Sequence, residues 1–174
     1  GSSFGRGINI NKTQTNHCFW LELNHYEPLF NPISTKISQY ERRNCQSRLS
    51  YCKTFAYGQQ IQARQEAKKS GHDDALLLNT RDEICCGTTS NLLVKRNGQL
   101  LTPDLTSGCL PGIMRSQGIK KGLFKEGKIS PIPKKDDQWI LINSLSCHAI
   151  QQIGKIKLKL FSNPDKLWAS LLLE

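Results

Sequence analysis

Residues 70–115, SGHDDALLLNTRDEICCGTTSNLLVKRNGQLLTPDLTSGCLPGIMR, decide the fold of this chain. Residues 75–78 and 92–94 are apolar runs of strand length, and each is followed by a polar turn. Residues 85–91 lie between these runs and are mostly small, a composition that lets the backbone approach a ligand closely. The Pro-Gly pair at 111–112 precedes a predicted helix, whose first N–H groups favour an anion. The stretch therefore predicts two strands of a half-buried sheet next to an anion site.

Taken in this order, these features resemble the fold-type IV pyridoxal-phosphate enzymes, which include branched-chain aminotransferases, D-amino-acid aminotransferases and 4-amino-4-deoxychorismate lyases. The family pattern is similar to G-x-D-[DE]-A-L-L-L-[ND], then small residues and S-N-L-[FL], then T-P and L-P-G-I-[TM]-R; residues 71–115 match nearly all of it. Residues 47–57 resemble the family's lysine segment, and residues 141–145 resemble the C-N-[AS]-L segment of the lyases. The resemblance implies an α+β fold, the large C-terminal domain of the D-amino-acid aminotransferase-like fold, with a curved mixed β-sheet flanked by helices.

The resemblance also implies a division of the chain. Residues 4–7, FGRG, resemble the G-G-R-G segment that ends the family's small N-terminal domain, and the region around them has no apolar periodicity. We therefore expect residues 1–17 to be an arm or interdomain linker and residues 18–174 to be the large pyridoxal-phosphate-binding domain. The family's small N-terminal domain would be absent from this chain. The expected partners are that missing domain of the same polypeptide, a second subunit in a homodimer, and a small-molecule substrate.

Further elements follow from apolar spacing and from capping residues. Additional strands are predicted at 18–23, 35–40, 138–145 and 149–160. Helices are predicted at 56–70, 114–123 and 163–173. Asn163 is expected to cap the last helix, with Pro164 at its first position.

Composition narrows the class of protein. The chain has 174 residues, of which 37% are apolar and 22% charged, as in an ordinary globular domain. No apolar run approaches the roughly 18 residues of a membrane span, so a cytoplasmic protein without membrane contact is expected. Seven cysteines without C-x-x-C pairs favour reduced thiols. No metal is expected, because the adjacent ligands Cys85 and Cys86 would point to opposite faces of a strand.

The net charge of +10 and the pI near 9.4 raise the alternative of a nucleic-acid binder. The basic residues are scattered, however, and Lys155, Lys157 and Lys159 alternate with apolar residues as on the solvated face of a strand. We therefore predict no nucleic-acid partner. A non-catalytic relative or a basic binding module remains the alternative from a different class.

The resemblance implies the roles of individual residues. Lys53 matches the lysine that binds the aldehyde of pyridoxal 5'-phosphate and later carries a proton, so it is the predicted catalytic residue. Arg6 is predicted to meet a substrate carboxylate, since a guanidinium suits bidentate recognition. The other predicted cofactor contacts are Tyr57 at the phenolic oxygen, the backbone N–H groups of Ile113 and Met114 and the Ser144 hydroxyl at the phosphate, and Cys86 at the ring nitrogen.

Cys86 is the main departure from the family. Family members carry a glutamate five positions before the asparagine that is Asn91 here, and that carboxylate keeps the pyridine nitrogen protonated. A neutral thiol cannot stabilise a pyridinium in this way, whereas a thiolate could. The position predicts either a weaker electron sink or a relative that has lost its activity.

The resemblance is closest to 4-amino-4-deoxychorismate lyase, which converts its substrate to 4-aminobenzoate and pyruvate in folate biosynthesis. Three features favour the lyases: Met114 in place of the aminotransferases' threonine, the segment 143–145, and the Gly-Arg-Gly arm around Arg6. A branched-chain or D-amino-acid aminotransferase is the first alternative.

Overall fold

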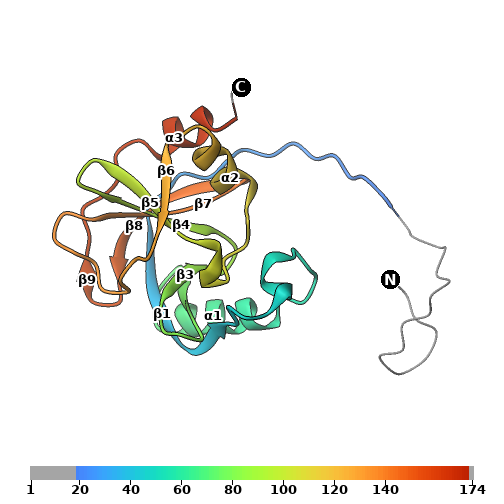
Figure 1. Cartoon of the computed structure of the whole chain (residues 1–174), viewed down its shortest axis with the longest axis horizontal. Helices are drawn as coiled ribbons and strands as arrows, with labels where there is room; N and C mark the ends of the chain where they lie inside the picture. The colour runs from blue at the N-terminus through green and yellow to red at the C-terminus, as the bar shows by residue number, and fades with distance from the viewer. Residues whose placement is uncertain (1–18, 173–174) are drawn as a thin grey trace.

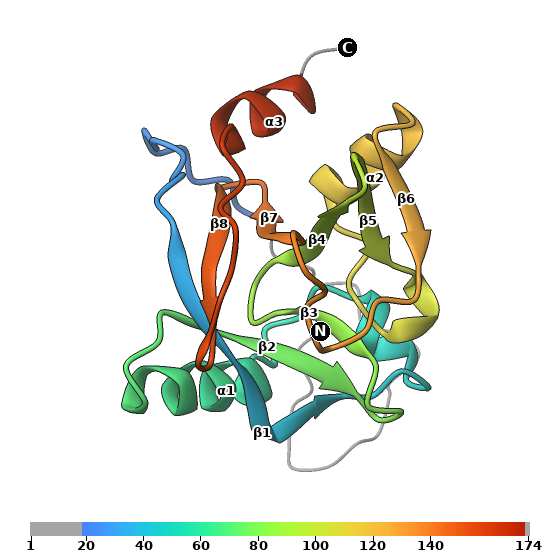
Figure 2. The same cartoon turned by 90° about the vertical axis from the view of Figure 1, so that its left-hand side faces the viewer.

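The computed structural model describes residues 19–172, and its fold is α+β, as predicted (Figures 1 and 2). Arg6 and the expected arm at 1–17 lie outside the described residues. The strands are β1 (Ile33–Arg43), β2 (Asp74–Asn79), β3 (Ile84–Gly87), β4 (Asn91–Arg96), β5 (Gln99–Pro103), β6 (Phe124–Gly127), β7 (Gln138–Asn143), β8 (Ser146–Ile153) and β9 (Ile156–Lys157). The helices are α1 (Gly58–Lys69), α2 (Ile113–Lys120) and α3 (Pro164–Ser170), with short 3-10 turns η1 (Arg48–Tyr51) and η2 (Leu105–Ser107).

The sheet curves until it closes on itself. Its strand order is β3-β2-β1-β8-β7-β4-β5-β6, and β3 also pairs with β4 through Cys86 and Asn91. Strands β1, β2, β3, β4, β7 and β8 therefore form a closed ring, from which β5 and β6 extend beyond β4. The strand pairs β1–β2, β1–β8 and β5–β6 are parallel, and the other pairs of the sheet are antiparallel. Closure gives every strand of the ring a partner on both sides.

Alternation along the strands divides the core into an inner and an outer part. On β2, Leu76 and Leu78 belong to a cluster that also contains Trp139 and Leu141 of β7, and this cluster fills the ring. Leu77 belongs instead to a second cluster, which faces α1. Period-two alternation in a curved sheet produces this division, because successive side chains point to opposite faces.

Helices cover the outside of the ring at two places, well separated in both views (Figures 1 and 2). Ala63 and Ala67 of α1 are fully buried, and their small side chains let the helix approach β1 and β2 closely. Helix α1 ends at Lys69, two residues before Gly71, which was predicted to terminate it and whose φ of +78° suits glycine. Helices α2 and α3 cover a third cluster that includes Met114 and Phe124.

Three sequence-based predictions about elements are wrong in part. The strand expected at 18–23 does not form in its described part, residues 19–23; Phe19 is 90% exposed there and has no apolar surface to pack on. The strand expected at 149–160 is a hairpin of β8 and β9, because Gly154 adopts a φ of +56° and reverses the chain. The last helix ends at Ser170, and the Asn163 side chain bonds Ser162 rather than capping it.

Strands β3, β5 and β6 were not among the predictions. Most of β3 lies in the run of small residues at 85–91, which has no strand pattern of its own. Strand β6 lies in a basic region with few apolar residues. Pairing with neighbouring strands, rather than local propensity, makes these segments strands. Within residues 19–172, no helix is long and apolar enough to cross a membrane.

Candidate cofactor site

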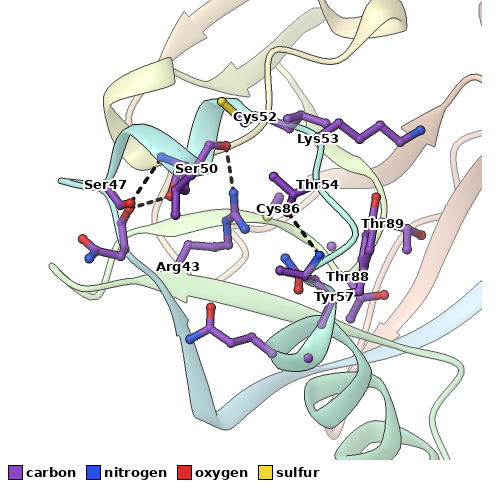
Figure 3. A pocket seen from close by; sticks show the side chains of 18 of the residues that line it. Arg43, Ser47, Ser50, Cys52, Lys53, Thr54, Tyr57, Cys86, Thr88 and Thr89 are labelled. Carbon is purple, nitrogen blue, oxygen red and sulfur yellow. Dashed lines mark hydrogen bonds between the residues drawn. The ribbon is translucent and has the colours of Figure 1, made fainter. Parts of the chain in front are cut away.

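A cavity of about 560 Å³ lies on the outer side of the ring, between the segment that leads into α1 and the connection from β3 to β4 (Figure 3). Its volume falls within the range of small-molecule sites. The lining residues come from three parts of the sequence. The first part supplies Arg43, Asn44, Ser47, Leu49, Ser50, Cys52, Lys53, Thr54, Ala56, Tyr57, Gly58, Gln59 and Gln60, the second supplies Cys86, Gly87, Thr88, Thr89, Ser90 and Asn91, and the third supplies Leu110. Three predicted site residues, Lys53, Tyr57 and Cys86, are thereby brought to one cavity.

Lys53 lies on the rim of this cavity. The chain reaches it through η1, which ends where the Cys52 N–H donates to the Leu49 carbonyl. Arg43 holds this segment, since its Nη2 donates to the Ser50 carbonyl at 2.9 Å and its Nε to the Gly108 carbonyl at 3.2 Å. The Lys53 side chain is exposed, and Figure 3 shows it extending along the rim, away from Arg43. Its amine is therefore accessible to a ligand that enters the cavity.

Tyr57 is half-buried at the position that precedes α1. Figure 3 shows its ring between Thr54 and Thr89, so that its hydroxyl belongs to the same cavity as Lys53. The five residues from Lys53 to Tyr57 thus place an amine and a phenol on one wall. This arrangement agrees with the predicted positions of both residues; their roles stay predictions.

Cys86 lies in the opposite wall, and a β-bulge determines its direction. The register between β2 and β3 shifts there, because Leu77 pairs with Cys86 whereas Leu78 pairs with Ile84. Cys85 is the extra residue, and the two cysteines share the outer cluster while Ile84 belongs to the inner one. The expectation that Cys85 and Cys86 point to opposite faces is therefore wrong, because strict alternation fails at a bulge.

Cys86 is a neutral thiol. The adjacent Cys85 sulfur and burial together raise the pKa of the Cys86 thiol well above its ordinary value. Only 8% of the residue is exposed. Of the two forms that the sequence left open at this position, the raised pKa favours the thiol over the thiolate.

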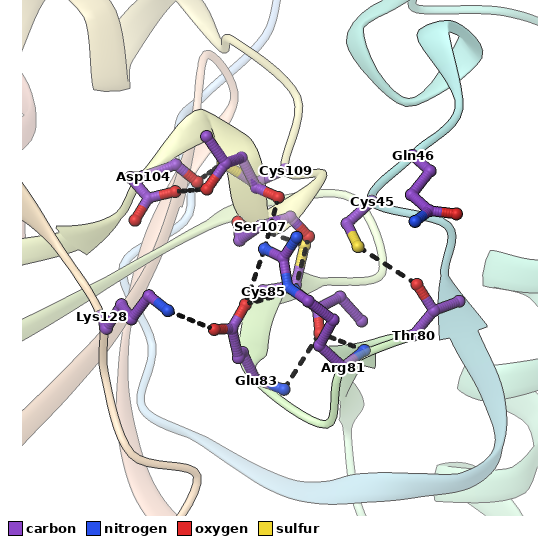
Figure 4. A network of polar contacts seen from close by, with 12 residues as sticks. Cys45, Gln46, Thr80, Arg81, Glu83, Cys85, Asp104, Ser107, Cys109 and Lys128 are labelled. Atoms are coloured by element: carbon purple, nitrogen blue, oxygen red, sulfur yellow. Dashed lines mark hydrogen bonds and ion pairs between the residues drawn. The ribbon is translucent and has the colours of Figure 1, made fainter.

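Behind the cysteine pair, a polar network ties the turn between β2 and β3 to the segment after β5 (Figure 4). Glu83 accepts from Asn79 at 3.0 Å, forms an ion pair with Arg81 at 2.8 Å and another with Lys128 at 3.0 Å. Bonds from Asn79, Lys128 and Arg81 lower the pKa of Glu83 to about 2. Ser107 donates to the Cys85 sulfur at 3.8 Å. The network thereby fixes the bulge that positions Cys86.

The predicted phosphate contacts at the start of α2 lie next to this cavity. Asn91, which lines it, donates to the Leu110 carbonyl at 2.8 Å, and a Cβ on Gly112 would come within 2.1 Å of the Asn91 Oδ1. No side chain caps the helix, so the N–H groups of Ile113 and Met114 have no capping acceptor. The Met114 side chain is 2% exposed and packs in the core, so only its backbone can serve a ligand.

Ser144 is exposed in the turn between β7 and β8 and does not line the cavity itself. Its neighbour Asn143 donates to the Thr89 carbonyl at 3.3 Å and to the Ser90 hydroxyl at 3.0 Å, which places the turn against the cavity wall. Arg6 lies outside the described residues. Within residues 19–172, no three His, Cys, Asp or Glu side chains are grouped as a metal site.

Sequence reasoning missed Arg43, whose bonds hold the Lys53 segment, and the hydroxyl residues Thr88 and Thr89. Arg43 ends β1 ten positions before Lys53, and nothing in its local sequence separates it from Arg42. Arg43, Thr88 and Thr89 share one feature, which is that each lies at or just after the end of a strand, on the side of the ring that carries the cavity.

Known proteins similar to this chain belong to one group. The sequence model described as amino-transferase class IV matches residues 1–154. A probable branched-chain-amino-acid aminotransferase of Aquifex aeolicus is 33% identical over 108 residues, which is 60% of this chain and 35% of that protein. A protein of Schizosaccharomyces pombe, provisionally named aminodeoxychorismate lyase, is 33% identical over 85 residues, 47% of this chain and 37% of that protein.

Among solved structures, a protein of Legionella pneumophila provisionally named 4-amino-4-deoxychorismate lyase superposes with a TM-score of 0.74 and 25% identity. The superposition covers 86% of this chain and 58% of that one. The chain thus spans little more than a third of the two curated relatives and less than two thirds of the solved one.

The raised pKa of Cys86 predicts its reactivity. In a Cys18→Ser background, a small methanethiosulfonate reagent should modify exposed Cys52 first at pH 8, and mass mapping should find Cys86 at least about a hundredfold slower. Because the thiolate fraction grows as pH rises toward a raised pKa, the Cys86 rate should still be increasing at pH 9. Rapid labelling of Cys86, lost in Cys86→Ser, would contradict a neutral buried thiol.

Glu83 should make stability depend on pH in a defined window. Its folded pKa of about 2 lies below the ordinary value of 4.5, so its stabilisation is complete above pH 4.5 and is lost as pH falls through about 2. Glu83→Gln should cost about 1–2 kcal/mol at pH 7 in urea unfolding, since the carboxylate is 24% exposed and partly screened.

The difference between wild type and Glu83→Gln should shrink as the pH is lowered from 4.5 toward 2. Glu27→Gln is the matched control, because Glu27 is exposed and forms no ion pair with the described residues. A difference that stays constant down to pH 2.5, or an equal loss in the control, would show that the network does not hold the turn.

Proposed function

Since the chain belongs to the amino-transferase class IV family, whose members depend on pyridoxal 5'-phosphate, we propose that the protein is a 4-amino-4-deoxychorismate lyase. The reaction would convert 4-amino-4-deoxychorismate to 4-aminobenzoate and pyruvate. The observation that carries this choice within the family is Cys86 itself, a cysteine in the cavity wall at the position where the family pattern has a glutamate. Similarity to the Legionella and Schizosaccharomyces proteins supports it.

The residues that line the cavity or lie next to it fit three of the cofactor's four polar groups. The accessible amine of Lys53 suits an aldehyde, and the Tyr57 hydroxyl on the same wall suits a phenolic oxygen. The uncapped N–H groups of Ile113 and Met114 suit a phosphate, with the Ser144 hydroxyl as a further donor. Cys86 does not fit the fourth group as a carboxylate would, because its neutral thiol cannot hold a ring nitrogen protonated.

When bound, pyridoxal 5'-phosphate supplies an aldehyde that condenses with amines and a ring that withdraws electrons. Lys53 would hold the cofactor until substrate displaces it, and its freed amine would take the proton from the substrate carbon that bears the amino group. The bond from the substrate ring to the enolpyruvyl oxygen then breaks, the ring becomes aromatic, and the leaving enol collects a proton to become pyruvate. Tyr57 and the α2 N–H groups would orient the cofactor against Lys53.

The thiol at Cys86 favours this elimination over amino transfer. In amino transfer, electrons must remain in the cofactor ring until a proton returns, so the reaction depends on a carboxylate partner of the ring nitrogen. Loss of about 3 kcal/mol of that stabilisation would slow the step about a hundredfold. The elimination places less charge in the ring, because electrons leave with the enolpyruvyl group and the product is aromatic.

We propose that parts of the whole protein outside residues 19–172 complete the site. Arg6 would meet a carboxylate of the small-molecule substrate, and the N-terminal domain implied by the family would complete the site. We propose a cytoplasmic homodimer for the full-length protein. A branched-chain or D-amino-acid aminotransferase is the second candidate, because the similar proteins of Aquifex aeolicus and Synechocystis are named as branched-chain-amino-acid aminotransferases. A non-catalytic relative is the third.

One assay separates these candidates. The full-length protein, loaded with pyridoxal 5'-phosphate, should release 4-aminobenzoate and equimolar pyruvate from 4-amino-4-deoxychorismate. Its conversion to the pyridoxamine form by branched-chain amino acids, followed by absorbance, should be at least about a hundredfold slower. Cys86→Glu should raise that side reaction more than it raises the lyase rate.

Two results would contradict the proposal. Rapid cycling of the wild-type protein with branched-chain amino acids would favour the aminotransferase. Absence of both reactions, with the cofactor bound, would favour a relative without catalytic activity. Cys52→Ser is the control for the cysteine substitution, because Cys52 lines the same cavity but is exposed.

A further inference from the structure

The connection from β3 to β4, residues 87–90, forms one wall of the cavity and is held by polar side chains from outside it. Its backbone is closed by one bond, from the Gly87 N–H to the Ser90 carbonyl at 2.9 Å. Gly87 lies against the Leu141 side chain, which a Cβ at Gly87 would meet at 2.8 Å. The three hydroxyl residues that follow it are each reached by a side-chain hydrogen bond.

On one side, these bonds come from Asp74. The Thr88 hydroxyl donates to the Asp74 Oδ1 at 2.5 Å, and the Asp74 carboxylate is paired with Arg64 of α1 through Nε at 3.3 Å and Nη2 at 2.9 Å. The Ala75 N–H also donates to the Asp74 Oδ1, at 2.8 Å. Arg64 reaches Thr89 at 3.4 Å. The Asp74 side chain is only 6% exposed, so water competes little for these bonds.

On the other side, the bonds come from Asn143, which donates to Thr89 and Ser90. Asn143 is the neighbour of Ser144, the predicted phosphate ligand. The connection at 87–90 is therefore clamped between the element that leads from Lys53 and the turn that carries Ser144.

We propose that Asp74, paired with Arg64, is a positioning residue that fixes Thr88 and thereby the wall against which the cofactor binds. This inference rests on the cavity being the cofactor site, and it holds for a lyase and for an aminotransferase alike. The adjacent Asp73 has a different task, since it accepts from Ser34 of β1 and pairs with Lys68, one turn beyond Arg64 on α1. Of the two neighbouring carboxylates, Asp74 thus holds the cavity wall, whereas Asp73 stabilises the fold.

The test removes one bond at a time. Thr88→Val deletes the hydroxyl at nearly constant volume, whereas Thr88→Ser keeps it. In this chain without cofactor, hydrogen exchange of the amides at 87–91 should be about tenfold faster in Thr88→Val and Asp74→Asn, and unchanged in Thr88→Ser and Asp73→Asn. In the full-length protein, the Kd for pyridoxal 5'-phosphate should rise about tenfold in Thr88→Val and Asp74→Asn. It should stay unchanged in Thr88→Ser and Asp73→Asn.

A merely structural role would lower the melting temperature of Asp73→Asn and Asp74→Asn alike and leave the exchange at 87–91 and the Kd unchanged in Thr88→Val. That result would overturn the proposal. Since the exchange measurement needs neither cofactor nor turnover, its outcome is separate from the identity of the reaction. A wild-type protein without lyase activity but with the predicted exchange pattern would refute the lyase and retain Asp74 as a positioning residue.

Discussion

The ring of strands closes through a single backbone pair, Cys86 of β3 with Asn91 of β4, and the candidate site is built on this seam. Closure requires β3 to bend from β2 toward β4, and the bulge at Cys85 provides the bend. The same bulge turns the Cys86 side chain out of the ring, toward the cavity. The geometry that closes the ring therefore also determines which side chain faces the cavity.

The parts of the fold with strong local signals were predictable from the sequence. Apolar runs predicted β2 and β4, apolar spacing that includes Ala63 and Ala67 predicted α1, and the Pro-Gly pair predicted the start of α2. Local sequence could not reveal the bulge, because a register shift depends on the partner strand. Nor could it reveal the turn at Gly154, where an alternating pattern continues across a change of direction.

The site was predictable to a similar degree and for a similar reason. Motif spacing located Lys53, Tyr57 and Cys86, which the structure brings to one cavity. It could not show that the Met114 side chain is buried in the core, or that Arg43 and Asp74 hold the two walls, since those contacts join segments distant in sequence. Cys86 then distinguishes this chain from the family pattern chemically. Under the proposed function, the choice between elimination and amino transfer would depend on charge at the ring nitrogen rather than on the fold.

Under the proposed function, Lys53 holds pyridoxal 5'-phosphate in this cavity. Borohydride reduction of the cofactor-loaded full-length protein, followed by peptide mapping, tests it most directly, because reduction fixes the cofactor to the lysine that binds it. We expect the label on the peptide that contains Lys53, and its loss in Lys53→Ala, with Lys69→Ala of α1 as a control that keeps the label. A label on another lysine, or no label in a protein that has bound the cofactor, would contradict the assignment.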